Sequence, residues 1–271
     1  MSEAIEFDRD LYRGTARDYN RFRVPYPQSM IGDLIERVQP SGRGRLLDLA
    51  CGTGQITFAV SGQFAELWAV DQEPDMIDAV RDKAAAANAS HVRAVLSAAE
   101  TLAAPASAFE LVAVGNAFHR LRREAVAAKT FQWLQPDRVI ALLWSSGPWV
   151  GDQDWQRAMS TVMDGWRTRL GVQGRAPAGW DRARQQRPDM SVLAEAGFQP
   201  VGSFRFPTDH DWTADELIGF VYSTSVLPRG VLGDRADVFE AQLRVELRSH
   251  ATGGKLPQTI DFAYELARRP K

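Results

Sequence analysis

Two aspartates and a glycine-rich turn are the residues of this sequence whose types and spacing indicate chemistry. Asp48 lies within the run LLDLACGTGQ at residues 46–55, and Asp71 follows 19 positions after Gly52. Glycines let a ligand approach the backbone closely, and a helix that starts after such a turn presents N–H groups and positive potential. A carboxylate at the spacing of Asp71 can accept hydrogen bonds from both hydroxyls of a ribose. The pattern therefore predicts a site for a ligand that contains a ribose.

A buried strand and a helix must position this turn. The apolar residues around Asp48 predict a parallel strand with both faces covered, and residues 56–60 predict the start of a helix. The dinucleotide fingerprint is excluded, because its third glycine would fall at Thr57. A P-loop is excluded as well, because no Gly-Lys-Ser/Thr follows the turn.

The run at residues 46–55 closely resembles the first motif of class I methyltransferases that use S-adenosylmethionine. Residues 97–102 resemble the phrase that borders the adenine in this family, and residues 116–119, Asn-Ala-Phe-His, look like its fourth motif. The resemblance implies an α/β fold with a Rossmann-like, doubly wound sheet of seven strands, the last antiparallel. Two positions depart from the family pattern: Ala98 replaces an acidic residue, and Arg120 replaces a tryptophan.

The expected cofactor is S-adenosyl-L-methionine. In the resembling family, a tyrosine or arginine of an N-terminal helical lid lies near the methionine carboxylate of the cofactor. The resemblance and the spacing together assign cofactor binding to these residues: Tyr19, Arg23, Asp48, Ala50, Gly52, Gly54, Asp71, Gln72, Met76, Ala99, Glu100 and Asn116.

Two histidines are candidates for catalysis. His119 follows the fourth strand, where open α/β sheets bind ligands, and it could orient the acceptor or take its proton. His210 lies between Asp209 and Asp211 and is the rival base. The alternative is structural: His119 fills a helix-start pocket, and His210 is exposed beside a helix cap. No metal is expected, because Gly-Asn-Ala stands at residues 115–117, where metal-dependent relatives carry acidic residues.

The resemblance predicts one methyltransferase domain over residues 1–271 with three additions to its core. The core is expected at about 44–146, 189–206 and 257–268, and a helical lid at about 7–38. The inserts at 147–188 and 207–256 should form caps over the cofactor, because both leave carboxyl ends of strands.

The caps should hold the acceptor, for which five residues are predicted: Trp149, Asp152, Asp154, Asp209 and Asp211. Aromatic faces stack on sugar rings and attract ammonium groups, and residues 222–226 look like those of natural-product methyltransferases. The preferred function is N- or O-methylation of an aminosugar, an aminoglycoside or another natural product. Carboxyl O-methylation of a small acid, of the trans-aconitate type, is an alternative. It would need arginines that converge in the caps, and the available ones are Arg167, Arg169, Arg175 and Arg182. A non-catalytic cofactor-binding regulator is a second alternative.

Composition narrows the classes of partner. The formal net charge is −2 over 271 residues, so neither nucleic acid nor an anionic membrane is an expected partner. Cys51 is the single cysteine, which rules out a disulfide framework within the chain. The acidic N-terminal residues do not resemble a signal peptide, and no apolar run reaches membrane-spanning length. A cytoplasmic monomer or homodimer that acts on a small molecule is expected.

Overall fold

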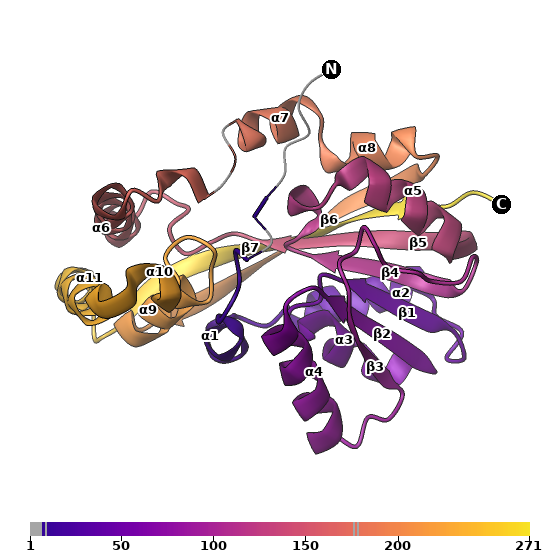
Figure 1. Cartoon of the computed structure of the whole chain (residues 1–271), viewed down its shortest axis with the longest axis horizontal. Coiled ribbons are helices and arrows are strands. Elements are labelled where there is room, and N and C mark those ends of the chain that lie inside the picture. Colours follow the sequence, from indigo (N-terminus) through magenta and orange to yellow (C-terminus); the bar gives the residue numbers. More distant parts are fainter. Residues whose placement is uncertain (1–6, 9, 176, 178) are drawn as a thin grey trace.

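Seven strands form one sheet in the order β3-β2-β1-β4-β5-β7-β6 (Figure 1). The computed structural model describes residues 7–8, 10–175, 177 and 179–271. β7 runs antiparallel to β5 and β6, whereas the other neighbours are parallel. The predicted α/β class and the antiparallel last strand are therefore confirmed. The strands are β1 (Arg45–Leu49), β2 (Glu66–Asp71), β3 (Val92–Leu96), β4 (Phe109–Gly115), β5 (Leu134–Ser145), β6 (Gln199–Trp212) and β7 (Leu256–Arg268).

Helices connect the strands and form the additions to the sheet. Helix α3 follows β1 directly, α4 joins β2 to β3, and α5 joins β4 to β5. The helices are α1 (Ala16–Phe22), α2 (Gln28–Val38), α3 (Gln55–Ala59), α4 (Pro74–Ala86), α5 (Arg123–Trp133), α6 (Asp154–Leu170), α7 (Trp180–Gln186), α8 (Asp189–Glu195), α9 (Ala214–Tyr222), α10 (Arg229–Leu232) and α11 (Ala236–His250). Short 3₁₀ turns are η1 (Ser61–Gln63), η2 (Phe118–Arg120), η3 (Gln173–Arg175) and η4 (Gly233–Arg235). None of the helices in the described part is long and apolar enough to cross a bilayer.

The central strands are apolar on both faces because helices cover both faces. Leu46 of β1 packs into a core with Met30 and Ile56, whereas the next residue, Leu47, packs into the opposite core with Val126. Successive side chains of a strand point to opposite faces, so a strand buried on both sides has no polar alternation. This is why the run around Asp48 predicted a buried strand correctly.

The order of the sheet determines where a ligand can bind. β1 lies between β2 and β4, so the chain connections diverge to opposite sides at the β1–β4 pair. Ligands of open α/β sheets bind in the crevice that this reversal leaves at the carboxyl ends of the strands. The turn after β1 and residues 116–119 after β4 both lie at this edge.

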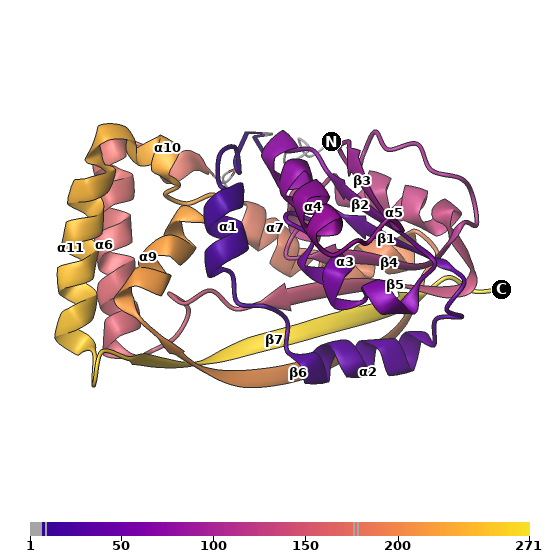
Figure 2. The ribbon, with the colours of Figure 1, turned by 90° about the horizontal axis from the view of Figure 1, so that it is seen from below.

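β6 and β7 form a long antiparallel pair that reaches well beyond the rest of the sheet (Figure 2). The sequence predicted that an insert begins at residue 207, but β6 continues to Trp212, which pairs with Leu256 of β7. The backbone ladder holds Asp209 opposite Thr259, so this polar stretch is a strand and not a loop. Pro207 is tolerated because β6 is an edge strand of the sheet and needs no partner on its outer side.

Only part of the predicted lid at residues 7–38 has the position of a lid. Helix α2 instead packs against the sheet: Met30 and Leu34 are fully buried, and Asp33 accepts a hydrogen bond from the hydroxyl of Tyr264 on β7. The Arg37 guanidinium lies 3.7 Å from the ring centroid of Phe204 on β6. Residues before Arg23 are left to cover the strand ends.

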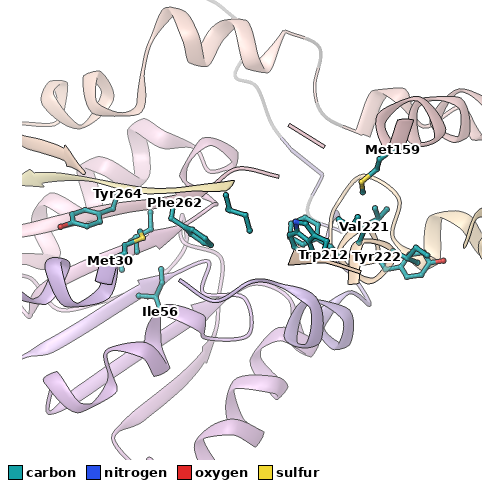
Figure 3. Packing of buried hydrophobic residues seen from close by; sticks show 14 of the residues in the cluster. Met30, Ile56, Met159, Trp212, Val221, Tyr222, Phe262 and Tyr264 are labelled. Atoms are coloured by element: carbon teal, nitrogen blue, oxygen red, sulfur yellow. The ribbon is translucent and has the colours of Figure 1, made fainter. Parts of the chain in front are cut away.

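The two inserts pack against each other and against the N-terminal segment. Helix α6 of the first insert lies beside α11 of the second, where Trp166 Nε1 donates to Gln242 at 2.9 Å (Figure 2). Helix α9 packs against α1 so closely that a Cβ on Gly219 would lie 2.3 Å from the ring of Phe22. Figure 3 shows one apolar cluster extending from Met30 and Tyr264 to Trp212 at the end of β6 and Tyr222 of α9.

Candidate functional site

The turn after β1 has the close-packed geometry that the glycines predicted. Ala50, Gly52 and Gly54 have φ values of 51°, 54° and 79°, in the left-handed region that favours glycine. A Cβ on Gly52 would lie 3.4 Å from the ring of Tyr19, whereas one on Gly54 would lie 2.9 Å from the ring of Phe58 in α3. Gly52 therefore faces the site, and Gly54 allows the turn to pack against its own helix.

Asp48 supports this turn from behind. Its Oδ2 atom accepts hydrogen bonds from the backbone N–H of Thr57 at 3.0 Å and from the Thr57 hydroxyl at 2.6 Å, which fixes the start of α3. Its Oδ1 atom is buried and has no hydrogen-bond partner in the structure. Burial raises the pKa of Asp48 to about 7, although the bonds from Thr57 oppose that shift.

Asp71 links the end of β2 to the same turn. One carboxylate oxygen accepts from the Gly52 N–H at 2.8 Å, and the other accepts from the Glu73 N–H at 3.0 Å. Burial raises the pKa of Asp71, and these backbone hydrogen bonds oppose the shift. The carboxylate also borders the cavity described next, where its remaining lone pairs are available to a ligand.

A cavity of about 670 Å³ opens at the carboxyl ends of β1, β2, β4 and β5. The strand ends and the N-terminal segment meet at this cavity. Twelve of the predicted site residues line it: Tyr19, Arg23, Ala50, Gly52, Asp71, Gln72, Met76, Ala99, Glu100, Asn116, His119 and Trp149. Seven others do not line it: Asp48, Gly54, Asp152, Asp154, Asp209, His210 and Asp211.

Three of the seven residues outside the cavity have other contacts that account for their positions. Asp154 starts α6, and its exposed carboxylate pairs with Arg157. Asp209 accepts from the Thr259 hydroxyl at 2.7 Å across the β6–β7 ladder. His210 lies on the same strand with its ring against Trp212, at a centroid distance of 4.3 Å. The extension of β6 thus carries the predicted Asp-His-Asp group away from the strand ends.

Arg23 is a half-buried cation on the N-terminal side of the cavity. Its guanidinium lies between the rings of Tyr19 and Phe220, at 4.6 and 4.5 Å from their centroids. It donates to the Ser223 hydroxyl at 2.9 Å and to the Ser223 carbonyl at 3.1 Å. Burial lowers the pKa of Arg23, and no carboxylate of the described residues forms a salt bridge with it. The side chain is therefore suited to hold a negative group of a ligand.

The segments that cover the cavity are tied together by Arg175 of η3. Its guanidinium donates to the Ser225 carbonyl at 2.7 Å and to the Leu11 carbonyl at 3.2 Å. It thereby joins the first insert, the second insert and the N-terminal segment. Of the four arginines predicted to converge on an acid, Arg167, Arg169, Arg175 and Arg182, none is among the residues that line the cavity.

His119 borders the cavity in an environment that keeps it neutral. Its ring stacks on Trp180, with 5.4 Å between the centroids and 27° between the planes. Burial lowers the pKa of His119 to about 4, and the positive charge of nearby Arg184 adds to this effect. Its Nε2 atom accepts a hydrogen bond from Arg120 Nε at 3.1 Å, so the proton of the neutral ring lies on Nδ1. Of the two predicted roles, orienting the acceptor fits this geometry better than taking its proton.

Several side chains at this end of the cavity escaped the sequence analysis. They come from segments far apart in the chain: Tyr12, Arg120, Trp180, Arg184, Asp189, Phe220 and Glu265. Arg120 alone left a signal, because it departs from the tryptophan of the resembling family. Within the part of the chain that the structure describes, no group of three or more His, Cys, Asp and Glu could hold a metal ion.

Comparison with known proteins finds similarity in the part of the sequence that holds the glycine turn. Residues 46–137 fit the family model described as a methyltransferase domain. An uncharacterized methyltransferase of Schizosaccharomyces pombe is 30% identical over 110 residues, which make up 41% of this chain and 41% of that protein. One of Mycobacterium tuberculosis is 28% identical over 128 residues, or 47% of this chain and 49% of that protein. The match thus spans less than half the length of these curated relatives.

Solved structures share the fold over nearly the whole chain. A candidate type II methyltransferase of Anaeromyxobacter dehalogenans has a TM-score of 0.58 at 19% identity, covering 92% of this chain and 99% of that one. The [4+2]-cyclase SpnF has a TM-score of 0.53 at 17% identity, covering 93% of this chain and 84% of that one. At these identities the likeness shows the fold alone. The match to a family model is confined to residues 46–137, which fit that of a methyltransferase domain.

Proposed function

We propose that this protein, whose residues 46–137 form a methyltransferase domain, transfers a methyl group from S-adenosylmethionine to a small-molecule acceptor. One observation carries the proposal. A single cavity connects the Gly52 turn and Asp71 with a chamber lined by Trp149, Trp180 and Phe220 of the inserts. Its volume of about 670 Å³ lies in the range of pockets for small ligands.

The residues of the strand ends fit the cofactor. The Asp71 carboxylate would accept from the ribose hydroxyls while it continues to hold the Gly52 N–H. Arg23, a half-buried guanidinium without a carboxylate partner among the described residues, would take the methionine carboxylate. The left-handed turn at Gly52 leaves the space that a side chain would fill.

The bound cofactor supplies an electrophilic methyl group on a sulfonium. The chain then has to hold the acceptor atom in line with the departing sulfur and exclude water. The N-terminal segment and both inserts cover the cavity, tied together by Arg175. Neutral His119, held by Arg120 and Trp180, would position the acceptor and not take its proton. Acceptors that reach the site already deprotonated, or as free amines, need no base.

The residues that line the cavity narrow the class of acceptor further. Natural products with flat or ring-shaped parts fit Trp149 and Trp180, which both face it. The aminosugar prediction depended on Asp152, Asp154, Asp209 and Asp211, which do not line it. We therefore still propose a natural product as the acceptor, but we no longer propose that the protein recognises it through an ammonium group.

Titration of the protein with S-adenosylmethionine and S-adenosylhomocysteine by calorimetry tests the cofactor site. Release of S-adenosylhomocysteine in the presence of an acceptor panel then tests transfer. We expect one cofactor molecule bound per chain and acceptor-dependent release. Absence of cofactor binding would contradict the proposal, and tight binding without transfer across the panel would favour a regulator.

A further inference from the structure

The cavity lining contains a second cation, Arg120, whose described contacts are with Tyr12 and His119 and not with the Gly52 turn. Arg120 ends η2, lines the cavity and is enclosed by surrounding side chains, which lowers its pKa to about 10. Its guanidinium lies 4.8 Å from the ring centroid of Tyr12 in the N-terminal segment. Its Nε atom donates to His119, whereas Nη1 is buried without a hydrogen-bond partner.

No carboxylate of the described residues forms a salt bridge with Arg120. The neighbouring acid, Asp189, is already shared by two other arginines: Arg123 and Arg184 approach it at 2.9 Å each. Glu265 also borders the cavity, but burial raises its pKa, which favours the neutral form of that carboxyl. Among the residues that the structure describes, no carboxylate therefore balances the positive charge of Arg120.

A guanidinium on the cavity wall without an anion carries a desolvation cost that its hydrogen bond to His119 and its contact with the Tyr12 ring offset only in part. Arg23 is similarly without a carboxylate, but it lies beside Tyr19 and can be compensated by the single carboxylate of the cofactor. Arg120 lies beside Tyr12 and His119 instead, so we assign the negative group that pairs with it to the second ligand. The His119 ring, which accepts from Arg120, holds the guanidinium in one orientation without adding charge.

We propose that Arg120 is an anion-binding residue for the acceptor, which carries a carboxylate next to an aromatic or other flat apolar part. The inference rests on the proposed function and narrows its substrate class. The carboxylate would pair with the Arg120 guanidinium, and the flat part would lie against Trp180 and Tyr12. The pairing concerns recognition and leaves open which atom of the acceptor receives the methyl group.

Paired probes of equal shape test this assignment: benzoate against benzamide and cinnamate against cinnamamide. Their affinities are measured by tryptophan fluorescence with S-adenosylhomocysteine at saturation, because Trp149 and Trp180 line the cavity. In the wild-type protein, the acids should bind about tenfold or more tightly than the amides, as expected for a charge-assisted pair. In Arg120→Met the acids should lose this advantage, and the amides should bind as before.

Arg122→Met is the matched control. It removes the same charge two positions away, and the hydrogen bond of Arg122 to Glu100 uses the backbone N–H. This variant should retain the preference for acids. Equal binding of acid and amide to the wild type, no binding of either acid, or an unchanged preference in Arg120→Met would each overturn the inference.

Two further measurements separate the inference from its premises. S-adenosylhomocysteine should bind Arg120→Met with wild-type affinity, whereas its failure to bind the wild type would overturn the proposed function itself. Without any ligand, Arg120→Met should melt at the wild-type temperature or above it, because the variant loses a charge on the cavity wall that no described carboxylate balances. A clear fall in melting temperature would show that the guanidinium is already satisfied in the free protein, and would overturn its role as a ligand anchor.

Discussion

The Asp71 carboxylate accepts a hydrogen bond from the Gly52 backbone N–H at 2.8 Å, across the carboxyl ends of β2 and β1. One residue therefore shapes the glycine turn and offers its free lone pairs to a ligand. The spacing between these two residues therefore matters for the shape of the site, because it allows the Asp71–Gly52 hydrogen bond to form. This bond also means that a change at Asp71 should have two measurable consequences.

Asp71→Ala should weaken the binding of S-adenosylmethionine by about 1–3 kcal/mol, the cost of losing charge-assisted hydrogen bonds. The melting temperature should fall too, because the Gly52 N–H loses its acceptor. Calorimetry and thermal unfolding measure the two effects. Asp78→Ala is the control, since this exposed aspartate of α4 pairs only with Arg81. Unchanged cofactor affinity in Asp71→Ala would contradict its assignment.

Substitutions at the two glycines should separate binding from stability. Gly52→Val should abolish binding of S-adenosylhomocysteine while most of the fold survives, because the side chain would enter the space between the turn and Tyr19. Gly54→Val should mainly lower the melting temperature, because its side chain would clash with Phe58 and Val80. Both variants also incur a backbone cost of about 1–2 kcal/mol at positive φ. Normal cofactor binding by Gly52→Val would place the cofactor elsewhere.

His119 should remain neutral throughout the physiological pH range. Its pKa is lowered to about 4, so NMR should show no titration of its ring between pH 6 and 8. His119→Ala should lower methyl transfer by misplacing the acceptor, and raising the pH should not restore the rate. Because the folded pKa lies below the unfolded value of about 6.5, His119 lowers stability as the pH falls from about 6.5 towards 4.

His210→Ala serves as the control for this prediction, since His210 lies on β6 outside the cavity lining. We expect cofactor affinity and turnover in this variant to stay within about twofold of the wild type, as for most substitutions away from a site. A large loss of turnover confined to His210→Ala would move the chemistry to the second insert.

Asp48 should make the protein less stable as the pH rises. Its pKa is raised to about 7 in the folded state, so its stabilising contribution is fully present below the unfolded pKa of about 4 and is lost towards pH 7. Asp48→Asn should keep both bonds from Thr57 and remove this dependence. Urea unfolding at pH 4.5 and 7.5 measures the change in the free energy of unfolding in the wild type and in the variant. Glu73 has the same sign of shift and is unchanged in the variant, so only the difference between the two proteins is informative. Parallel pH profiles would contradict the prediction.

The sequence by itself determined the parts of this protein that local patterns encode. The run around Asp48 contains a strand buried on both faces, a left-handed glycine turn and a helix start, and residues 46–137 fit a methyltransferase domain. The spacing from Gly52 to Asp71 brought these residues to adjacent strand ends, because β1 pairs with β2 in parallel register. Such features depend on neighbours within a few positions or on one strand–helix–strand unit.

Only the tertiary structure decided which insert residues meet the cavity. Asp209 and His210 were expected in a cap over the cofactor, but pairing with Thr259 and Gln258 of β7 keeps them in a strand that leads away from the site. Arg175 looked available to an acid, but it is used to join Ser225 and Leu11. Arg120 has no carboxylate partner among the described residues, and Asp189, which also lines the cavity, pairs with two other arginines. These outcomes depend on contacts between segments far apart in the chain, which local spacing does not specify.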